Sequence, residues 1–214
     1  MWTACLWAAA LGIAPLLVNA QEATPGAGGA SVDVSLVDTT GQEVGIATFS
    51  EGADGVAVSI HIEGLEPGDH GWHLHAMGVC EPSGLEPFAT AGPHWNPAGK
   101  MHGAPDAPQH HAGDFGNFTA ADDGSGDATI TTQDFTLGTG PTSVFDEDGT
   151  AIIIHAGKDD LVTQPAGNSG ARYACGVVAR PKAMPAQELS SMIPARDASM
   201  AAIQPVSVPR SWRP

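Results

Sequence analysis

Basic side chains are scarce in this sequence. Its 214 residues include 8 Lys and Arg against 24 Asp and Glu, which gives a formal net charge of −16. Between residues 21 and 180 the only cations are Lys100, Lys158, Arg172 and Arg180. Because nucleic acids and anionic membranes are bound through clustered positive charge, this composition argues strongly against both as partners.

Cysteine is equally sparse, with three residues in the chain. An apolar run at the N-terminus, residues 4–18, is too short to span a bilayer comfortably and is followed by small residues up to Ala20. We expect residues 1–20 to be an export signal that is removed. Because basic residues ahead of the run are missing, an uncleaved anchor or a buried N-terminal helix is the alternative.

Removal of that signal would discard Cys5 and leave Cys80 and Cys175, an even pair in a protein bound for an oxidising compartment. A single disulfide is the simplest outcome, and two free buried cysteines are the alternative. The sequence therefore predicts a periplasmic or secreted protein with no membrane attachment after cleavage.

Composition divides the remainder of the chain into three parts. Residues 21–30 are rich in Gly, Ala and Pro and are expected to be a flexible lead-in. Residues 31–180 are expected to form one domain. Residues 181–214 are rich in Pro, Ala, Ser and Met without sustained periodicity and are expected to be a disordered tail, with a short helix at 187–193 as the alternative.

Within the domain, short stretches rich in Val, Ile and Thr recur between turn sequences. They are residues 32–37, 44–49, 56–62, 72–75, 115–119, 128–132, 151–155 and 175–179. This spacing indicates an all-β sandwich or barrel. Residues 80–113 and 157–173 lack strand patterning, and loops of such length inside a compact domain are usually functional or disordered. Function is the better explanation, because both carry residues suited to chemistry.

An ordered series of metal-ligand residues is the most informative feature of the chain: His73, His75, His94, His102, His111, Asp114 and His155. In a strand, side chains two apart point to the same side, so His73 and His75 can grip one ion while Trp72 and Leu74 face the other way. The series therefore predicts a preformed bidentate grip within a two-metal site.

Three later residues, His102, His111 and Asp114, are ligands of the kind that complete a tetrahedral zinc site together with a fourth imidazole. His94 lies between the two groups in the sequence and is the natural fourth ligand. An imidazole that has lost its ring proton can bind a metal at each nitrogen. One residue could therefore bridge both ions.

Four motifs together are more specific than any histidine pair. They are GWHLH at 71–75, AGPHWNP at 91–97, HAGD at 111–114 and GNSGARYACGV at 167–177. In this order they resemble the copper/zinc superoxide dismutase family over about residues 31–179. The long segment 81–90 resembles the bacterial exported branch of that family. The resemblance implies an eight-stranded Greek-key β-sandwich or flattened barrel with two long functional loops.

The resemblance also implies one copper and one zinc per subunit. Copper would be held by His73, His75, His94 and His155, and zinc by His94, His102, His111 and Asp114. His110 is an alternative to His111, which we prefer because it keeps the spacing to Asp114, leaving His110 as a solvated neighbour. His61 and His70 are expected to be structural.

Other roles follow from the same resemblance. Asp159 is expected to orient one histidine of each metal, with Asp160 as the alternative if the loop register differs. Arg172 is expected to hold the superoxide anion, because its charge is permanent and its planar donors can orient an oxyanion. Pairing of Cys80 with Cys175 would then tie the first long loop to the strand that positions Arg172.

The implied activity converts superoxide into dioxygen and hydrogen peroxide by alternate reduction and oxidation of the histidine-bound copper. Arg172 and His94 are the expected catalytic residues, and Lys100 and Lys158 could steer the anion to the site. A homodimer is favoured over a monomer. The rival hypotheses are a copper and zinc buffer without turnover and a purely structural β-sandwich module.

Overall fold

The computed structural model describes residues 29–180, in which eight strands account for the regular structure apart from one 3₁₀ turn, Ala89–Ala91. The strands are β1 Ser31–Asp38, β2 Glu43–Gly52, β3 Gly55–Ile62, β4 Gly68–His75, β5 Asp114–Ala120, β6 Gly126–Thr132, β7 Thr150–His155 and β8 Arg172–Val178. The all-β prediction is confirmed. The predicted export signal, most of the lead-in and the C-terminal tail lie outside the described residues.

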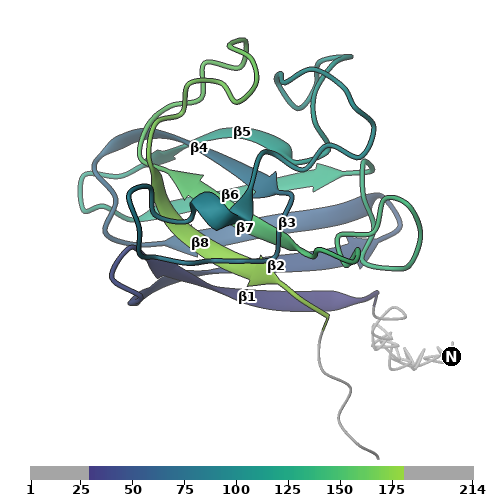
Figure 1. The fold of residues 1–214 in the computed structure, drawn as a ribbon, viewed down its shortest axis with the longest axis horizontal. Coiled ribbons are helices and arrows are strands. Elements are labelled where there is room, and N and C mark those ends of the chain that lie inside the picture. Colours follow the sequence, from purple (N-terminus) through teal and green to yellow (C-terminus); the bar gives the residue numbers. More distant parts are fainter. Residues whose placement is uncertain (1–28, 181–214) are drawn as a thin grey trace, which may run out of the picture.

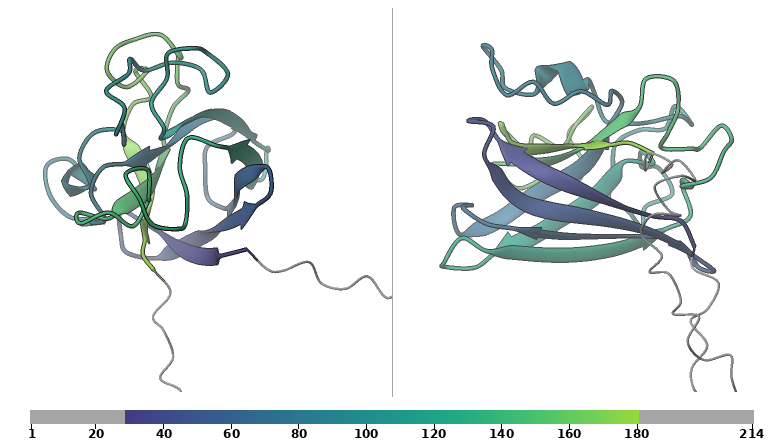
Figure 2. Two further views of the ribbon diagram at one scale, coloured as in Figure 1. Left: turned by 90° about the vertical axis from the view of Figure 1, so that its right-hand side faces the viewer. Right: turned by 90° about the horizontal axis from the view of Figure 1, so that it is seen from below.

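All eight strands belong to one antiparallel sheet in the order β5-β4-β7-β8-β1-β2-β3-β6. The sheet curls around a central core, so that its two end strands, β5 and β6, come close to each other (Figures 1 and 2). The connections from β3 to β4 and from β6 to β7 cross between distant strands, as in a Greek key. This is the predicted flattened barrel.

Alternation of apolar and polar residues explains the inward faces of the strands. In β1, Val32, Val34 and Leu36 are buried while the residues between them are exposed. β7 differs, because every one of its residues is buried. Ile152 and Ile154 pack into the barrel core, whereas Ile153 packs in a second cluster on the outer face of the sheet. A strand covered on both faces needs a nearly continuous apolar run.

The outer cluster is made by the first long loop, residues 76–113, folding back over β7. Phe88 is fully buried there and packs with Ala91 and Ile153. The disulfide between Cys80 and Cys175 fastens the same loop to β8, with the two Cα atoms 5.7 Å apart. The predicted disulfide is therefore present, and it covers the sheet beside the histidines of β4.

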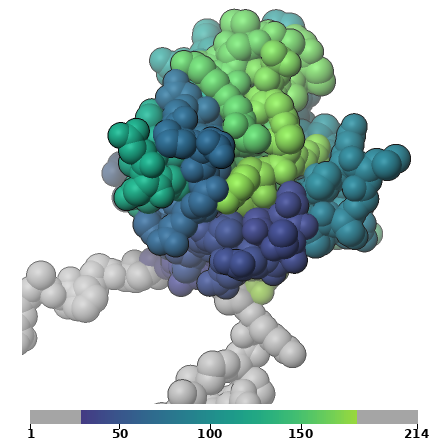
Figure 3. Space-filling model, turned by 90° about the vertical axis from the view of Figure 1, so that its left-hand side faces the viewer, coloured from purple at the N-terminus to yellow at the C-terminus, as the bar shows by residue number. Residues whose placement is uncertain are grey.

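The two long loops project from the same side of the barrel. Residues 156–171, which connect β7 to β8, and the later part of residues 76–113 lie side by side in Figures 1 and 2, and Figure 3 shows the former as a raised rim above β8. Every strand begins at least one residue earlier than the sequence predicted, and two begin three or more residues earlier: β4 at Gly68 and β8 at Arg172. The first residues of these two strands have no apolar run that would mark them in the sequence. They belong to the strands because they pair with β5 and β7.

No helix within residues 29–180 is long and apolar enough to cross a membrane.

The disulfide is expected to be a large contributor to stability, because it joins residues 95 positions apart in the sequence. Replacing both Cys80 and Cys175 by Ser should lower the free energy of unfolding by about 2–5 kcal/mol in urea titrations of the chelator-treated protein. Ser83→Ala, in the same loop at an exposed position, is the control and should change little. A double variant as stable as the control would contradict this role.

Candidate metal centre

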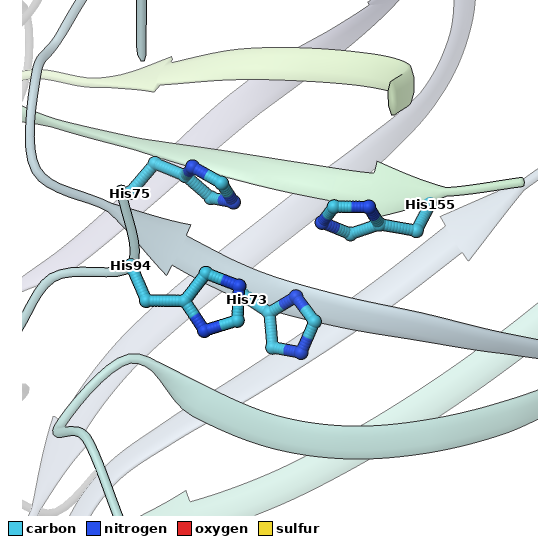
Figure 4. A group of neighbouring side chains, drawn as sticks. All are labelled: His73, His75, His94 and His155. Carbon is cyan, nitrogen blue, oxygen red and sulfur yellow. The ribbon is translucent and has the colours of Figure 1, made fainter. Parts of the chain in front are cut away.

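The predicted bidentate grip lies on the outer face of β4. His73 and His75 point away from the core, while Trp72 and Leu74 pack inside it. His155, the last residue of β7, lies on the same face. His94 reaches the group from the first long loop, which forms an isolated bridge with β4 at His75. Figure 4 shows the four imidazoles gathered in one place.

The four rings turn one nitrogen each toward a common point. Donor atoms of the group lie within 4.8 Å of one another and all four residues are buried. Four nitrogens have no hydrogen-bond partner: Nδ1 of His73 and Nε2 of His75, His94 and His155. Leaving buried polar atoms unpaired is costly, so four such atoms converging on one point fit a bound cation.

The opposite nitrogens of these rings are held in place. Nε2 of His73 lies 2.6 Å from the Asp159 carboxylate, and Nδ1 of His75 lies 2.8 Å from the Gly92 carbonyl oxygen. Burial lowers the pKa of His73 to about 4 and that of His155 to about 3, and it also lowers the pKa of His75 well below its usual value. The imidazoles of His73, His75 and His155 are therefore neutral at neutral pH, which is the form that binds metals.

A second group shares His94 and adds His102, His111 and Asp114, again with donor atoms within 4.8 Å of one another. Asp114 oxygens lie 2.8 Å from Nδ1 of His94, 3.0 Å from Nδ1 of His102 and 3.3 Å from Nδ1 of His111. Ligand atoms around a tetrahedral zinc lie about 3.3 Å apart, since the bonds to the ion are about 2.0–2.1 Å. The spacing and the donor types fit zinc.

Nδ1 of His102 and Nδ1 of His111 lie close to Asp114 but form no hydrogen bond with it. Such contacts are expected between ligands of one ion. Burial lowers the pKa of His102, but the carboxylates of Asp114 and Asp159 outweigh it and raise that pKa to about 9. Burial raises the pKa of Asp114, but His102 and His94 hold it well below its usual range.

Asp159 connects the two groups. It is fully buried, and its carboxylate accepts hydrogen bonds from Nε2 of His73 at 2.6 Å and from Nε2 of His102 at 3.0 Å. Asn117 fixes its main chain, with bonds of 2.7 and 2.9 Å to the amide and carbonyl groups of Asp159. Asp160 does not take this place. Its carboxylate instead accepts the main-chain N–H groups of Val162 and Thr163.

Gly167 allows this arrangement by lacking a side chain. A Cβ there would lie 1.7 Å from Oδ1 of Asp159 and 2.6 Å from Nε2 of His102, and the residue has a φ of +65°. A side chain would therefore push the carboxylate away from the histidine. The sequence motif contains this glycine, but its reason becomes visible only in three dimensions.

The other histidines lie outside both groups. His110 is half-buried and hydrogen-bonded to Asp134 at 3.1 Å and to the Ala107 carbonyl oxygen, so the expectation of a solvated neighbour is wrong. His61 pairs with Asp127 on the surface. His70 is buried, with its ring nitrogens 2.8 and 2.7 Å from main-chain carbonyl oxygens, which is a structural arrangement.

A cavity of about 960 Å³ opens above the first group and is lined by His75, His94, His155 and Arg172. Arg172 is the strand partner of His155, and its guanidinium donates to the carbonyl oxygens of Phe88 and Gly92. The Gly92 oxygen also faces Nδ1 of His75. Burial lowers the pKa of Arg172 while Glu86 raises it; at neutral pH the guanidinium stays charged.

The two predicted steering residues do not line this cavity. Nζ of Lys158 lies 2.8 Å from Asp69, and Nζ of Lys100 lies 4.0 Å from Asp134. Their steering role stays a prediction. Sequence reasoning missed Glu86 and Gln164, which do line the cavity and carry no recognisable motif.

Comparison with known proteins gives consistent similarities. Residues 43–178 match the family described as "Copper/zinc superoxide dismutase (SODC)". A protein from Deinococcus radiodurans named superoxide dismutase (Cu-Zn) is 42% identical over 155 residues, covering 69% of this chain and 83% of its own length.

Solved structures are similar as well. A SOD-like protein from Bacillus subtilis, in a double-mutant form, is 40% identical with a TM-score of 0.63, covering 69% of this chain and 96% of its own. The clock protein EA4 is 31% identical with a TM-score of 0.59, covering 69% of this chain and 92% of its own.

Asp159 should govern metal affinity through the two rings it orients. Asp159→Asn is expected to weaken Zn²⁺ binding about 10–100-fold, because an amide cannot accept from both imidazoles equally well. Competition with a chromophoric chelator would measure this. Asp106→Asn removes the same charge at an exposed position of the first loop and should leave the affinity unchanged. Equal affinities of the two variants would exclude an orienting role.

Gly167→Ala should lower stability mainly because the new Cβ would collide with the Asp159 carboxylate. The positive φ should account for only part of the loss. Gly99 has a similar φ of +63°, but no atom lies within 4 Å of the place that a Cβ would take there. We expect Gly167→Ala to lower the free energy of unfolding by about 1–3 kcal/mol more than Gly99→Ala. Urea denaturation of both variants tests this, and similar losses would show that the close approach to Asp159 is unimportant.

Proposed function

The chain belongs to the copper/zinc superoxide dismutase family, and we propose that it dismutates superoxide at the cavity beneath Arg172, with His73, His75, His94 and His155 as copper ligands. Two superoxide anions and two protons give one dioxygen and one hydrogen peroxide. The observation that carries the proposal is the convergence of four unpaired, buried imidazole nitrogens below a permanent cation.

The donor types support assigning different metals to the two groups. Four imidazole nitrogens suit copper, whereas three imidazoles and one carboxylate suit a tetrahedral zinc. Copper would supply one-electron chemistry by alternating between two oxidation states, and zinc would stay redox-silent. His94, His102, His111 and Asp114 are the proposed zinc ligands, and His94 belongs to both sets because its two nitrogens face the two groups.

Arg172 is proposed to bind the substrate anion. Its guanidinium is fixed by two carbonyl oxygens of the first long loop, so little side-chain entropy remains to be lost when an anion binds. Its partner in the sheet is His155, which brings the positive charge beside the copper ligands. A fixed cation at this point would attract and orient superoxide as it enters.

His94 is proposed to supply a proton. Its Nδ1 lies 2.8 Å from Asp114, while its Nε2 faces the copper group and has no hydrogen-bond partner. Nε2 is therefore the atom that could hold one of the two protons consumed and donate it to the reduced oxygen. Asp114 would keep the ring in one orientation during this transfer.

The disulfide supports a location outside the cytoplasm, because such bonds persist in oxidising compartments. We therefore keep the proposal of a periplasmic or secreted enzyme. A metal buffer on the same scaffold would not need Arg172 above the copper ligands. The arginine thus favours turnover over storage.

Arg172 provides the sharpest test. Arg172→Ala should lower kcat/KM for superoxide at least about tenfold at unchanged copper and zinc content, because the variant loses the cation that attracts the anion. Arg172→Lys should retain part of the rate. Arg180→Ala removes the same charge outside the cavity lining and should act like the wild type. Wild-type protein with full metal content and no turnover would favour the buffer instead.

A further inference from the structure

The side chain of Gln164 forms two hydrogen bonds with the main chain of one residue, His102. The His102 N–H donates to Oε1 over 2.9 Å, and Nε2 donates to the His102 carbonyl oxygen over 2.9 Å. The reverse amide orientation would set donor against donor and acceptor against acceptor, so these contacts fix the orientation. A side chain here supplies the pair of bonds that a neighbouring strand would give.

His102 needs such a partner because it is buried yet lies in the loop of residues 76–113, outside every strand. Buried main-chain groups are almost always hydrogen-bonded, and losing a partner is costly. The ring of His102 lies between Asp114 and Asp159. Residues 156–171 therefore hold His102 at three points: Asp159 at the ring and Gln164 at both main-chain groups.

Gln164 itself is presented by a closed turn. The carboxylate of Asp160 accepts the N–H groups of Val162 and Thr163 over 3.0 and 2.7 Å. The turn closes where the Asp160 N–H donates to the Gly167 carbonyl oxygen and the Gly167 N–H donates to that of Thr163, over 2.8 and 2.7 Å. The position of Gln164 is thus fixed relative to Asp159, which directly precedes the turn.

We propose that Gln164 is a positioning residue for His102. Through this contact, ordering of the zinc site and ordering of the turn that lines the cavity are coupled. The inference rests on the proposed zinc site. The turn that carries Gln164 also contributes Thr163 and Ala166 to the lining of the cavity above the copper ligands. Fixing His102 in a zinc site would therefore fix that wall, and a displaced wall would loosen His102.

Gln164→Ala tests the proposal on copper-free protein, with two readouts. Its dissociation constant for Zn²⁺, from chelator competition, should rise about tenfold, the low end for residues that orient metal ligands. Hydrogen exchange should show that Zn²⁺ slows the amides of residues 160–168 in the wild type but not in the variant. The amides of residues 103–113 should be slowed in both proteins.

Two further variants sharpen the comparison. Gln164→Glu keeps the length of the side chain but sets a carboxylate oxygen against the His102 carbonyl oxygen, so it should weaken Zn²⁺ binding at least as much as the Ala variant. Gln133→Ala removes an exposed glutamine whose amide donates to the Asp54 carbonyl oxygen over 3.3 Å. It should behave like the wild type in both readouts.

The outcomes separate the inference from the proposed function. The inference alone would be overturned if the wild type binds Zn²⁺, the dissociation constant of the Gln164→Ala variant is within twofold of the wild-type value, and Zn²⁺ protects residues 160–168 equally in both. A wild-type protein that binds no Zn²⁺ would overturn the zinc site and the inference with it. Weakened binding together with lost protection would support the coupling of the two loops.

Discussion

The buried carboxylate of Asp159 is the interaction on which the metal end of this barrel depends. It accepts from His73 on β4 and from His102 in the first long loop, and so it ties a rigid strand to a segment without regular structure. A buried carboxylate is tolerable only when it is well paired. Burial raises the pKa of Asp159, yet the hydrogen bonds from His102 and His73 hold it well below its usual range. The pairing is therefore strong enough to keep it charged.

The strands of the barrel contribute one rigid face, and the two long loops bring His94, His102, His111 and Asp159 to it. β4 and β7 supply His73, His75 and His155 from the outer side of a sheet whose inner side is the main core. The first long loop is then fastened to that face at separate points by the disulfide and by the buried side chain of Phe88. Rigid strands and a fastened loop together would hold the proposed metal ligands in position in advance of binding.

Much of this was predictable from the sequence, for physical reasons. Alternation and β-branched residues predicted the strands, and the two-residue spacing of His73 and His75 predicted that they share one face. The assignment of His155 to the same group rested on the family resemblance. The start of β4 escaped prediction because Gly68, Asp69 and His70 show no apolar alternation. Contacts between distant segments escaped as well: His110 pairs with Asp134 across 24 positions, and Gln164 pairs with His102 across 62. No local pattern encodes such pairs.

The Gly92 carbonyl oxygen serves Arg172 and His75 at once, at 2.6 and 2.8 Å. The spacing between Phe88 and His94 is therefore constrained, since one inserted residue would displace both Arg172, the proposed anion-binding residue, and His75, a proposed copper ligand. The preceding stretch is under no such restraint. Residues 82–85 lie in a loop that is closed by a hydrogen bond from the Phe88 N–H to the Glu81 carbonyl oxygen. They do not line the cavity, and Leu85 is fully exposed. Insertions and substitutions can therefore accumulate in this exposed segment, close to the cavity, without changing the geometry around Arg172 and His75.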